Sequence, residues 1–312
     1  HRSVDPAADR HGWRERPCRP LQALQCPAAA SRGRSRRPEA RMFRRINRLL
    51  VAARDLDGAA AAFRRGLGLG AGKRIDVPDV GAVSEALPLG DAWVQVLQPV
   101  AEGPVSRFLQ EKGPGIYGIG IEVGSLADVR LRVEQSGRQA HPLHLGEQEL
   151  VCLKREQLPG FTIWFSESGS GPEPADLSTR LLGIWQATSL VEDRDEGAEM
   201  YARLLGRPER NEAFRSEEYG YLGRTLYYGA GPLADSIEVA QVHRADSAMG
   251  RFWRKRGPGI YMVTLNTDDL RAVYRGLSER DVRHTPGPRS PDRILFIHPA
   301  ELAGCFVGVI AP

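Results

Sequence analysis

A pentapeptide, Gly-Pro-Gly-Ile-Tyr, occurs twice in this chain, at residues 113–117 and 257–261, which places the copies 144 residues apart (257 − 113). Each copy follows an Arg-Phe pair at the same distance and precedes an apolar run. A second pattern, which starts at Asp55 and again at Asp193, repeats with an offset of 138 residues (193 − 55). An internal repeat of this length indicates two similar halves, so each half can be compared with the other.

The length of 312 residues suits two domains of ordinary size. We expect the first domain at 42–167 and the second at 182–312. Between them, residues 168–181 are rich in Ser, Gly and Pro, a composition typical of a surface linker.

The first 41 residues differ from the rest in charge. They contain ten arginines and four acidic residues, a net charge of +6, so a chain of net +4 leaves −2 on the remainder. Without an apolar pattern this segment is expected to be disordered. It would serve as a basic arm or a transit peptide, or it lies upstream of a true start at Met42, which is the interpretation we favour.

The near-neutral remainder does not indicate a nucleic-acid partner. Cys152 and Cys305 lie in separate apolar runs with no CxxC pair, which favours a reducing compartment and a cytoplasmic protein. No apolar stretch approaches the ~20 residues of a membrane span, so no membrane partner is expected.

Each half shows the same order of expected elements. Strands are expected at 45–53, 83–89, 93–97, 116–123, 150–153 and 161–165 in the first half, and at 184–191, 225–228, 236–240, 261–266, 293–298 and 305–310 in the second. Helices are expected at 56–66, 105–112, 126–136, 196–205 and 270–280. The order predicts four βαβββ-like units.

Several segments resemble the vicinal oxygen chelate superfamily, which includes glyoxalase I, methylmalonyl-CoA epimerase, extradiol dioxygenases and bleomycin-resistance proteins. They are INRLLVAARDLDGAAAAFRRGLG, VSEALPLGDAWVQVLQPV, VSRFLQEKGPGIYGIGIEVGSLADV and RILFIHPAELAGCFVGVI. The resemblance covers 45–311 in two tandem copies and is closest in texture to the epimerases. It implies an α+β fold in which four βαβββ modules form two tandem, cup-shaped, mixed-sheet domains.

In that superfamily a divalent metal sits inside the cup on four strand positions, most often His, Glu or Gln, His and Glu. The positions hold Arg48, Gln95, Gly118 and Trp164 in the first half, and Gln186, Glu238, Met262 and Gly308 in the second. A divalent ion needs three or four hard or borderline ligands. The seven histidines show no metal-binding spacing, and His284 is expected in a Pro-rich loop. We therefore expect no metal and no other cofactor.

Glu85 and Arg48 are the candidate catalytic residues. The segment VSEALPLG resembles the epimerase strand that carries a catalytic glutamate. We expect Glu85 to face the cup, where burial would raise its pKa and suit it to remove a proton next to a carbonyl or thioester. Arg48 would then stabilise the developing oxyanion in place of a metal. The alternative is a structural ion pair between the two residues.

The candidate substrate-binding residues are Gln95, Tyr117, Trp164, Gln186, Glu238 and Tyr261. The two glutamines would orient the substrate. Glu238, the second-half analogue of Gln95, would act as a general base or pair with Arg251. The aromatic residues would form a ligand-stacking wall, or they would pack in the core as strand aromatics usually do.

Two functions remain open. The residues favour a metal-independent isomerase, epimerase or lyase that acts on a small oxygenated or CoA-linked metabolite. The alternative is a non-catalytic ligand-binding or sequestration protein of the bleomycin-resistance type. A ring-cleaving dioxygenase is set aside because neither half holds two His and one Glu at the ligand positions. The expected partner is a small molecule, with a homodimer left open.

Overall fold

The computed structural model describes residues 42–167, 169, 179–229, 231, 234–288 and 290–311. The expected tail at 1–41 lies outside these residues, and so does most of the expected linker at 168–181. The division into two domains with these boundaries stays a prediction.

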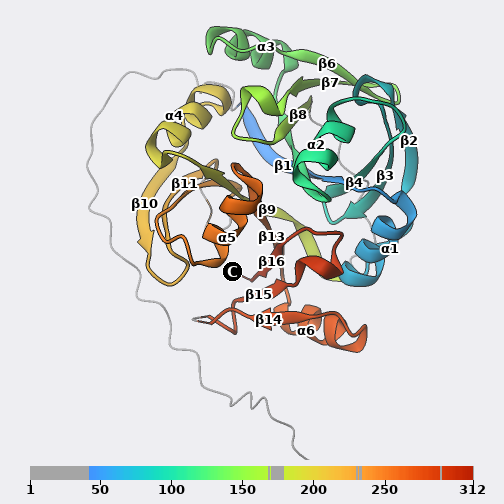
Figure 1. Ribbon diagram of the computed structural model, residues 1–312, viewed down its shortest axis with the longest axis vertical. Coiled ribbons are helices and arrows are strands. Elements are labelled where there is room, and N and C mark those ends of the chain that lie inside the picture. Colours follow the sequence, from blue (N-terminus) through green and yellow to red (C-terminus); the bar gives the residue numbers. More distant parts are fainter. Residues whose placement is uncertain are drawn as a thin grey trace, which may run out of the picture. The chain divides into compact units, whose positions relative to one another are not determined.

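The described residues form one unit four times, a strand followed by a helix and three further strands (Figure 1). The first half contains β1 (Phe43–Ala52), α1 (Leu56–Leu67), β2 (Lys73–Val77), β3 (Ala82–Leu89), β4 (Ala92–Pro99), β5 (Gly115–Val123), α3 (Leu126–Gln135), β6 (His141–Leu145), β7 (Gln148–Leu153) and β8 (Thr162–Glu167). The second half contains β9 (Leu181–Val191), α4 (Arg194–Leu205), β10 (Arg210–Ser216), β11 (Tyr221–Tyr227), β12 (Ser236–Val242), β13 (Gly259–Thr267), α6 (Leu270–Glu279), β14 (His284–Pro286), β15 (Ile294–Ile297) and β16 (Val307–Ile310). Within each half one further helix joins the two units, α2 (Pro104–Lys112) in the first and α5 (Ala248–Arg256) in the second. The expected α+β fold of four βαβββ modules is confirmed.

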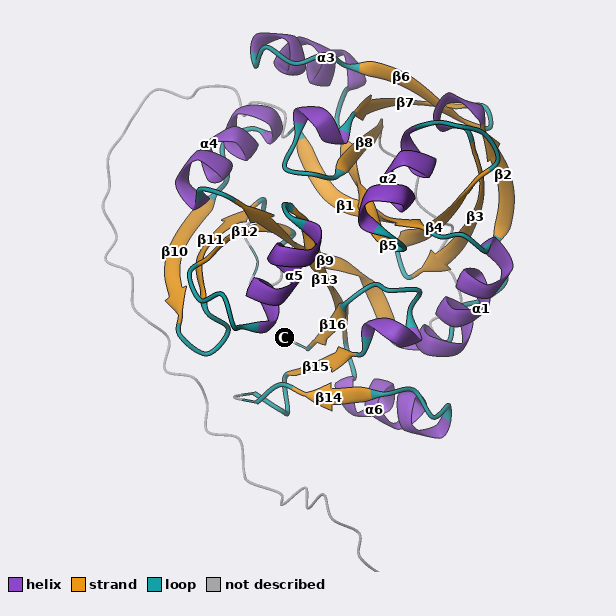
Figure 2. Cartoon of the chain, viewed as in Figure 1, coloured by secondary structure: helices purple, strands orange, loops and turns teal. Residues whose placement is uncertain are grey.

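The modules pair through their first strands. β1 pairs antiparallel with β5 and parallel with β4, and β9 pairs in the same two ways with β13 and β12. β1 and β9 also pair with each other, at Ile46 and Ile184, so the sixteen described strands belong to one sheet. In Figure 2 the strands of each half curl around a single helix, α2 or α5. We call these concave sides the first cup (β1 to β8) and the second cup (β9 to β16).

The repeated aspartate sets where two of the helices begin. The Asp55 side chain accepts a hydrogen bond from the backbone N–H of Gly58 at 3.1 Å, and Gly68 ends α1 in the left-handed region with a φ of 73°. Asp193 begins α4 in the same way, by accepting from two backbone N–H groups of that helix. The first N–H groups of a helix lack partners within it, so an aspartate at this position stabilises the start.

Strand alternation divides the apolar side chains into layers. The outer faces of the strands pack against α1, α3, α4 and α6 in one large cluster that spans both halves. The inner face of the first cup forms a separate cluster together with α2. The inner face of the second cup contributes a much smaller buried cluster, made of Leu190, Tyr221, Ala240 and Met249.

Four strands and one helix were not among the expected elements. The strands are β2, β6, β10 and β14, each at the outer end of its module. β10 and β14 contain no buried residue, so they lack the apolar alternation that reveals a strand, and β2 and β6 alternate over only two apolar positions each. The expectation that His284 lies in a loop is wrong, because it begins β14. The unexpected helix is α5.

None of the helices in the described part of the chain is both long enough and apolar enough to cross a membrane.

Candidate functional site

A chain of polar side chains crosses the first cup. Arg48 Nη1 donates to Gln95 Oε1 at 3.3 Å, and Gln95 Nε2 donates to Ser84 Oγ at 2.7 Å. Arg48 Nη2 also donates to Gln148 Oε1 at 3.2 Å. Arg48 is only 3% exposed, and this burial lowers its pKa to about 10, so the guanidinium stays charged at neutral pH. The residues assigned to two ligand positions, Arg48 and Gln95, thus lie side by side.

Apolar side chains fill the rest of the first cup. Trp164 is 0% exposed and Tyr117 is 2% exposed. Phe108 of α2 packs edge-on against Tyr117, with ring centroids 5.2 Å apart, and Val105 and Leu109 of the same helix join the cluster. Tyr117 and Trp164 therefore pack in the core, as the alternative to a ligand-stacking wall expects.

The expectation that Glu85 faces the first cup is wrong. In the β3–β4 pairing Glu85 lies opposite Val96, whereas Ala86 lies opposite Gln95. Side chains alternate along a strand, so Glu85 points to the outer face of the sheet. There Arg64 of α1 donates to Glu85 Oε1 at 2.5 Å, and Arg74 of β2 lies 3.5 Å from Oε2. Glu85 forms an ion pair with these arginines rather than with Arg48.

Strand register gives the positions that correspond between the two cups. Leu50 of β1 lies opposite Gln95 and Gly118, while Thr188 of β9 lies opposite Glu238 and Met262. In the same way, Trp164 corresponds to Gly308, because β8 and β16 pair equivalently with β5 and β13. The correspondence read from the repeat therefore holds in three dimensions.

The second cup keeps a buried carboxyl group. Tyr221 donates its hydroxyl to Glu238 Oε1 at 2.6 Å, and Thr188 donates to Oε2 at 2.7 Å. Burial raises the pKa of Glu238, while the two hydroxyl hydrogen bonds partly oppose that rise. Nearby, Gln186 Nε2 donates to Ser236 Oγ at 3.1 Å. Arg251, the partner considered for Glu238, instead donates to the main-chain oxygen of Asp246.

The other wall of the second cup is only half-buried. The half-buried side chains of this wall include Tyr261 and Met262 of β13, Phe296 of β15, Phe306 just before β16, and Ile310 of β16. The rings of Tyr261 and Phe306 meet edge-on with centroids 5.3 Å apart, and Phe296 lies 5.6 Å from Phe306. The second cup therefore presents an aromatic wall to solvent, which the first cup does not.

The family resemblance implies a divalent metal ion, and the residues at the four positions do not fit one. In the first cup Arg48 places a cation there, and a Cβ at Gly118 would lie 2.1 Å from the main-chain oxygen of Thr162. In the second cup Met262 and Gly308 supply no hard ligand, and both oxygens of Glu238 already accept hydrogen bonds. Within the described ranges, no group of three or more His, Cys, Asp or Glu side chains is arranged to hold a metal ion.

Sequence reasoning missed the two residues that hold Glu238. Thr188 lies two positions after Gln186 on β9, so strand alternation alone would place both side chains on one face. Tyr221 begins β11 four residues before the expected start of that strand at 225, so it lies outside the elements expected from the sequence.

Comparison with known proteins agrees with this fold. The chain is 36% identical over 112 residues to an ethylmalonyl-CoA/methylmalonyl-CoA epimerase of Cereibacter sphaeroides, covering 35% of this chain and 81% of the relative. It is 31% identical over 84 residues to the human mitochondrial methylmalonyl-CoA epimerase, covering 26% of this chain and about half (48%) of the human protein. No family model matches the sequence.

Among solved structures, a mutant of 4-hydroxymandelate synthase from Streptomyces coelicolor aligns with a TM-score of 0.65 at 16% identity, covering 86% of this chain and 92% of that one. At this identity the likeness concerns the fold alone. It extends over most of the residues of both chains, whereas the epimerase match covers about one third of this chain. Together with the four βαβββ modules, these matches show that the chain belongs to the vicinal oxygen chelate superfamily.

Proposed function

We propose that the second cup is the working site of this protein. It binds a small oxygenated or CoA-linked metabolite and moves a proton next to the carbonyl of that metabolite, without a metal ion. The observation that carries the proposal is Glu238, a carboxyl group buried behind a half-open aromatic wall with both oxygens held by neutral hydroxyls. The relatives support the reaction class, because they are named as epimerases of CoA esters.

Glu238 is suited to the role of base because burial disfavours its charged form and so raises its pKa toward neutral pH. Thr188 and Tyr221 fix the orientation of the carboxylate. The proton leaves the carbon next to the carbonyl for a Glu238 oxygen, and the electron pair left behind moves into the enolate. The protonated carboxyl then returns the proton to a neighbouring carbon or to the leaving group.

A single carboxyl is enough for an isomerase or a lyase, because one group can take the proton and return it. An epimerase needs a second acid on the opposite face of the substrate, and that position in the second cup is Gly308. The isomerase and lyase reactions are therefore favoured over epimerisation. Gln186 and Tyr261 are assigned to orienting the substrate.

The proposal is tested by exchange of substrate protons with solvent. A panel of acyl-CoA esters and hydroxy-ketones is incubated with the protein in deuterium oxide, and deuterium uptake is followed by mass spectrometry. Glu238→Gln should slow uptake by at least about 100-fold, the usual contribution of a general base, and leave substrate affinity within about threefold.

Glu85→Gln is the matched control, because Glu85 is a second buried glutamate that faces α1 instead of a cup. It should leave the exchange rate unchanged. Unimpaired exchange in Glu238→Gln, or loss of exchange only in Glu85→Gln, would show that Glu238 is not the base.

The second candidate function is binding without chemistry. It is favoured by the aromatic wall of Tyr261, Phe296 and Phe306, which offers stacking surface to a planar ligand. Stoichiometric binding of a panel compound with no deuterium uptake in the unchanged protein would assign the protein to this class.

A further inference from the structure

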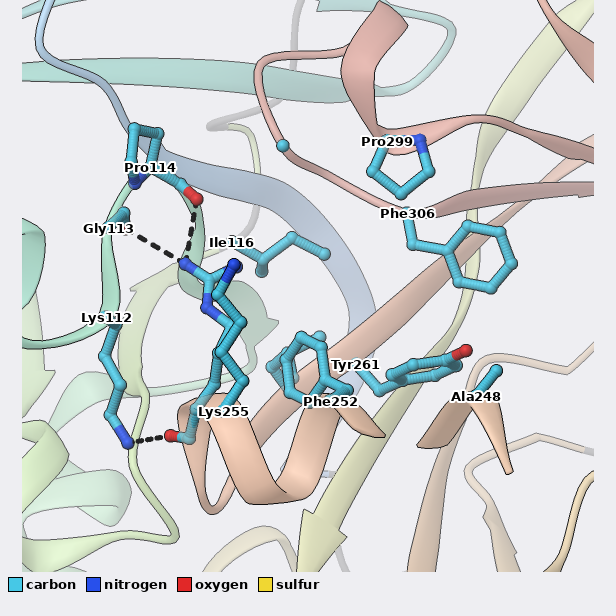
Figure 3. Close-up of a pocket in the computed structure, with 13 residues that line it drawn as sticks. Lys112, Gly113, Pro114, Ile116, Ala248, Phe252, Lys255, Tyr261, Pro299 and Phe306 are labelled. Carbon is cyan, nitrogen blue, oxygen red and sulfur yellow. Dashed lines mark hydrogen bonds between the residues drawn. The ribbon is translucent and has the colours of Figure 1, made fainter. Parts of the chain in front are cut away.

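A cavity of about 610 Å³ lies where the turn after α2 approaches the second cup. The first half contributes Lys112 and the Gly113-Pro114 turn, and the second half contributes α5, β13 and the segment before β16 (Figure 3). A volume between about 300 and 1,000 Å³ is typical of sites for small organic ligands. The repeated Gly-Pro-Gly-Ile-Tyr segments thus bring the two halves together around a space of ligand size.

One side of this cavity is aromatic. Phe252 and Tyr261 meet edge-on with centroids 5.2 Å apart, and Tyr261 meets Phe306 at 5.3 Å. All three side chains are half-buried and line the cavity. Tyr261 also packs in the cluster that contains Tyr221, the residue that donates to Glu238. The cavity therefore adjoins the wall behind which Glu238 lies.

The other side of the cavity is cationic. Three cations line it, Lys112, Lys255 and Arg256, and none of its lining residues within the described ranges is acidic. Arg256 Nη2 donates to the main-chain oxygens of Gly113 at 3.0 Å and Pro114 at 2.8 Å, and Lys112 donates to the main-chain oxygen of Arg256 (Figure 3). These two cations are therefore held in place by neutral carbonyl groups.

Cations gathered without a carboxylate destabilise one another, and burial increases the penalty. Burial lowers the pKa of both Lys112 and Arg256, and the charges of Arg155 and Arg256 lower that of Lys112 further, while Glu111, which does not line the cavity, acts in the opposite direction. An anion placed among them would relieve this repulsion and accept charge-assisted hydrogen bonds.

We propose that this cavity binds an organic anion, whose carboxylate or phosphate lies among Lys112, Lys255 and Arg256 and whose apolar or aromatic body packs on Phe252, Tyr261 and Phe306. The inference deepens the proposed function by assigning the charged part of the substrate, and it rests on that function only for the link to Glu238. The anion site itself stands on the cavity, its cations and its aromatic wall.

The test measures binding of 2-naphthoate and of its uncharged analogue 2-naphthamide to the full chain by calorimetry. We expect 2-naphthoate to bind at least about tenfold more tightly, and added salt to weaken only 2-naphthoate. Coenzyme A is the second probe. Competition between it and 2-naphthoate would assign the site to phosphate-bearing ligands, and binding of 2-naphthoate alone would assign it to carboxylates.

Lys255→Met should weaken 2-naphthoate about tenfold, because Lys255 is an exposed side chain at the cavity whose removal disturbs little else. Arg254→Met is the matched control, since it removes the same charge from the same helix outside the cavity. It should change affinity less than twofold. Phe306→Leu should weaken both naphthalene probes by a similar factor.

Equal binding of the charged and uncharged probes, or equal effects of the Lys255 and Arg254 variants, would overturn the proposal. Absence of binding by all three probes would also overturn it. Failure of the proposed function is a separate outcome, because Glu238→Gln should abolish proton exchange while 2-naphthoate affinity stays the same.

Discussion

The two cups are built from the same repeated module, yet one is closed and the other is half-open. The helix beside each cup accounts for much of this difference. In the first cup α2 buries Val105, Phe108 and Leu109 against the strands, whereas the only buried residues of α5 are Met249 and Gly250. The bulk of Trp164 is replaced by Gly308 at the corresponding position, and Leu50 is replaced by Thr188.

This comparison teaches how one repeated fold can form a packed core in one half of a chain and a partly open cup in the other. A few interior side chains decide whether a curved sheet encloses a core or a ligand. In the first cup, the positions that hold metal ligands in the family are occupied by hydrogen-bonded polar side chains and by packed apolar side chains. The second keeps a carboxyl group next to accessible aromatic surface.

The largest expected effect tests whether the first cup is a packed core. Trp164→Ala should lower the free energy of unfolding by about 3–5 kcal/mol, because it leaves a large buried cavity. Phe306→Ala in the second cup should lower it by only about 1 kcal/mol, because that side chain is already half-exposed. Urea denaturation measures both values. Similar losses of stability in the two variants would contradict the conclusion that only the first cup is a packed core.

A smaller effect is expected from adding a methyl group to each cup. The Cβ of Gly118→Ala would lie 2.1 Å from the main-chain oxygen of Thr162, so β5 and β8 must separate, and we expect a loss of about 2–3 kcal/mol. In Gly308→Ala the nearest atoms are side-chain atoms at 3.3–3.6 Å, so the loss should stay below about 1 kcal/mol. Thermal unfolding of the two variants compares them directly. If Gly118→Ala left the stability unchanged, β5 and β8 would be able to separate more easily than the packing of the first cup indicates.

The last effect is seen only as a change of stability with pH and concerns the seam between the halves, where Asp235 accepts a hydrogen bond from the backbone N–H of Ile46 at 2.5 Å. Burial, and to a lesser degree the nearby Asp91, raises the pKa of Asp235 from its usual 3.8 to about 7. The folded chain therefore holds this proton more tightly than the unfolded chain does. As a result, the stability contributed by Asp235 falls as the pH rises from about 4 to about 7.

Asp235→Asn keeps an acceptor for Ile46 but removes the titration. It should flatten the decline in stability over that pH window by about 4 kcal/mol, because each of roughly three pH units contributes about 1.4 kcal/mol. Denaturation midpoints at pH 4, 5, 6 and 7 measure the slope. Asp91→Asn, which alters the exposed neighbour, should leave the slope nearly unchanged. An unaltered slope in Asp235→Asn would assign the pH dependence to other groups.

The module order and the correspondence between Gln95 and Glu238 could be predicted from the sequence, because both follow from the repeat. The orientation of Glu85 could not be predicted in this way. Ser84, Glu85, Ala86 and Leu87 are all buried, so this stretch shows no alternation from which to read its faces. Only the pairing of Glu85 with Val96 places it on the side of α1.

The sequence by itself determined that two similar halves, each of two βαβββ modules, lie in tandem and that the imidazole ligands of the family are missing from both. The tertiary structure decided which copy stays accessible and which carboxyl group points inward. Strand register sets the direction of every side chain, and the neighbouring helix sets how far a cup is covered. Both depend on contacts between residues that are distant in the chain, so neither can be read from a local pattern.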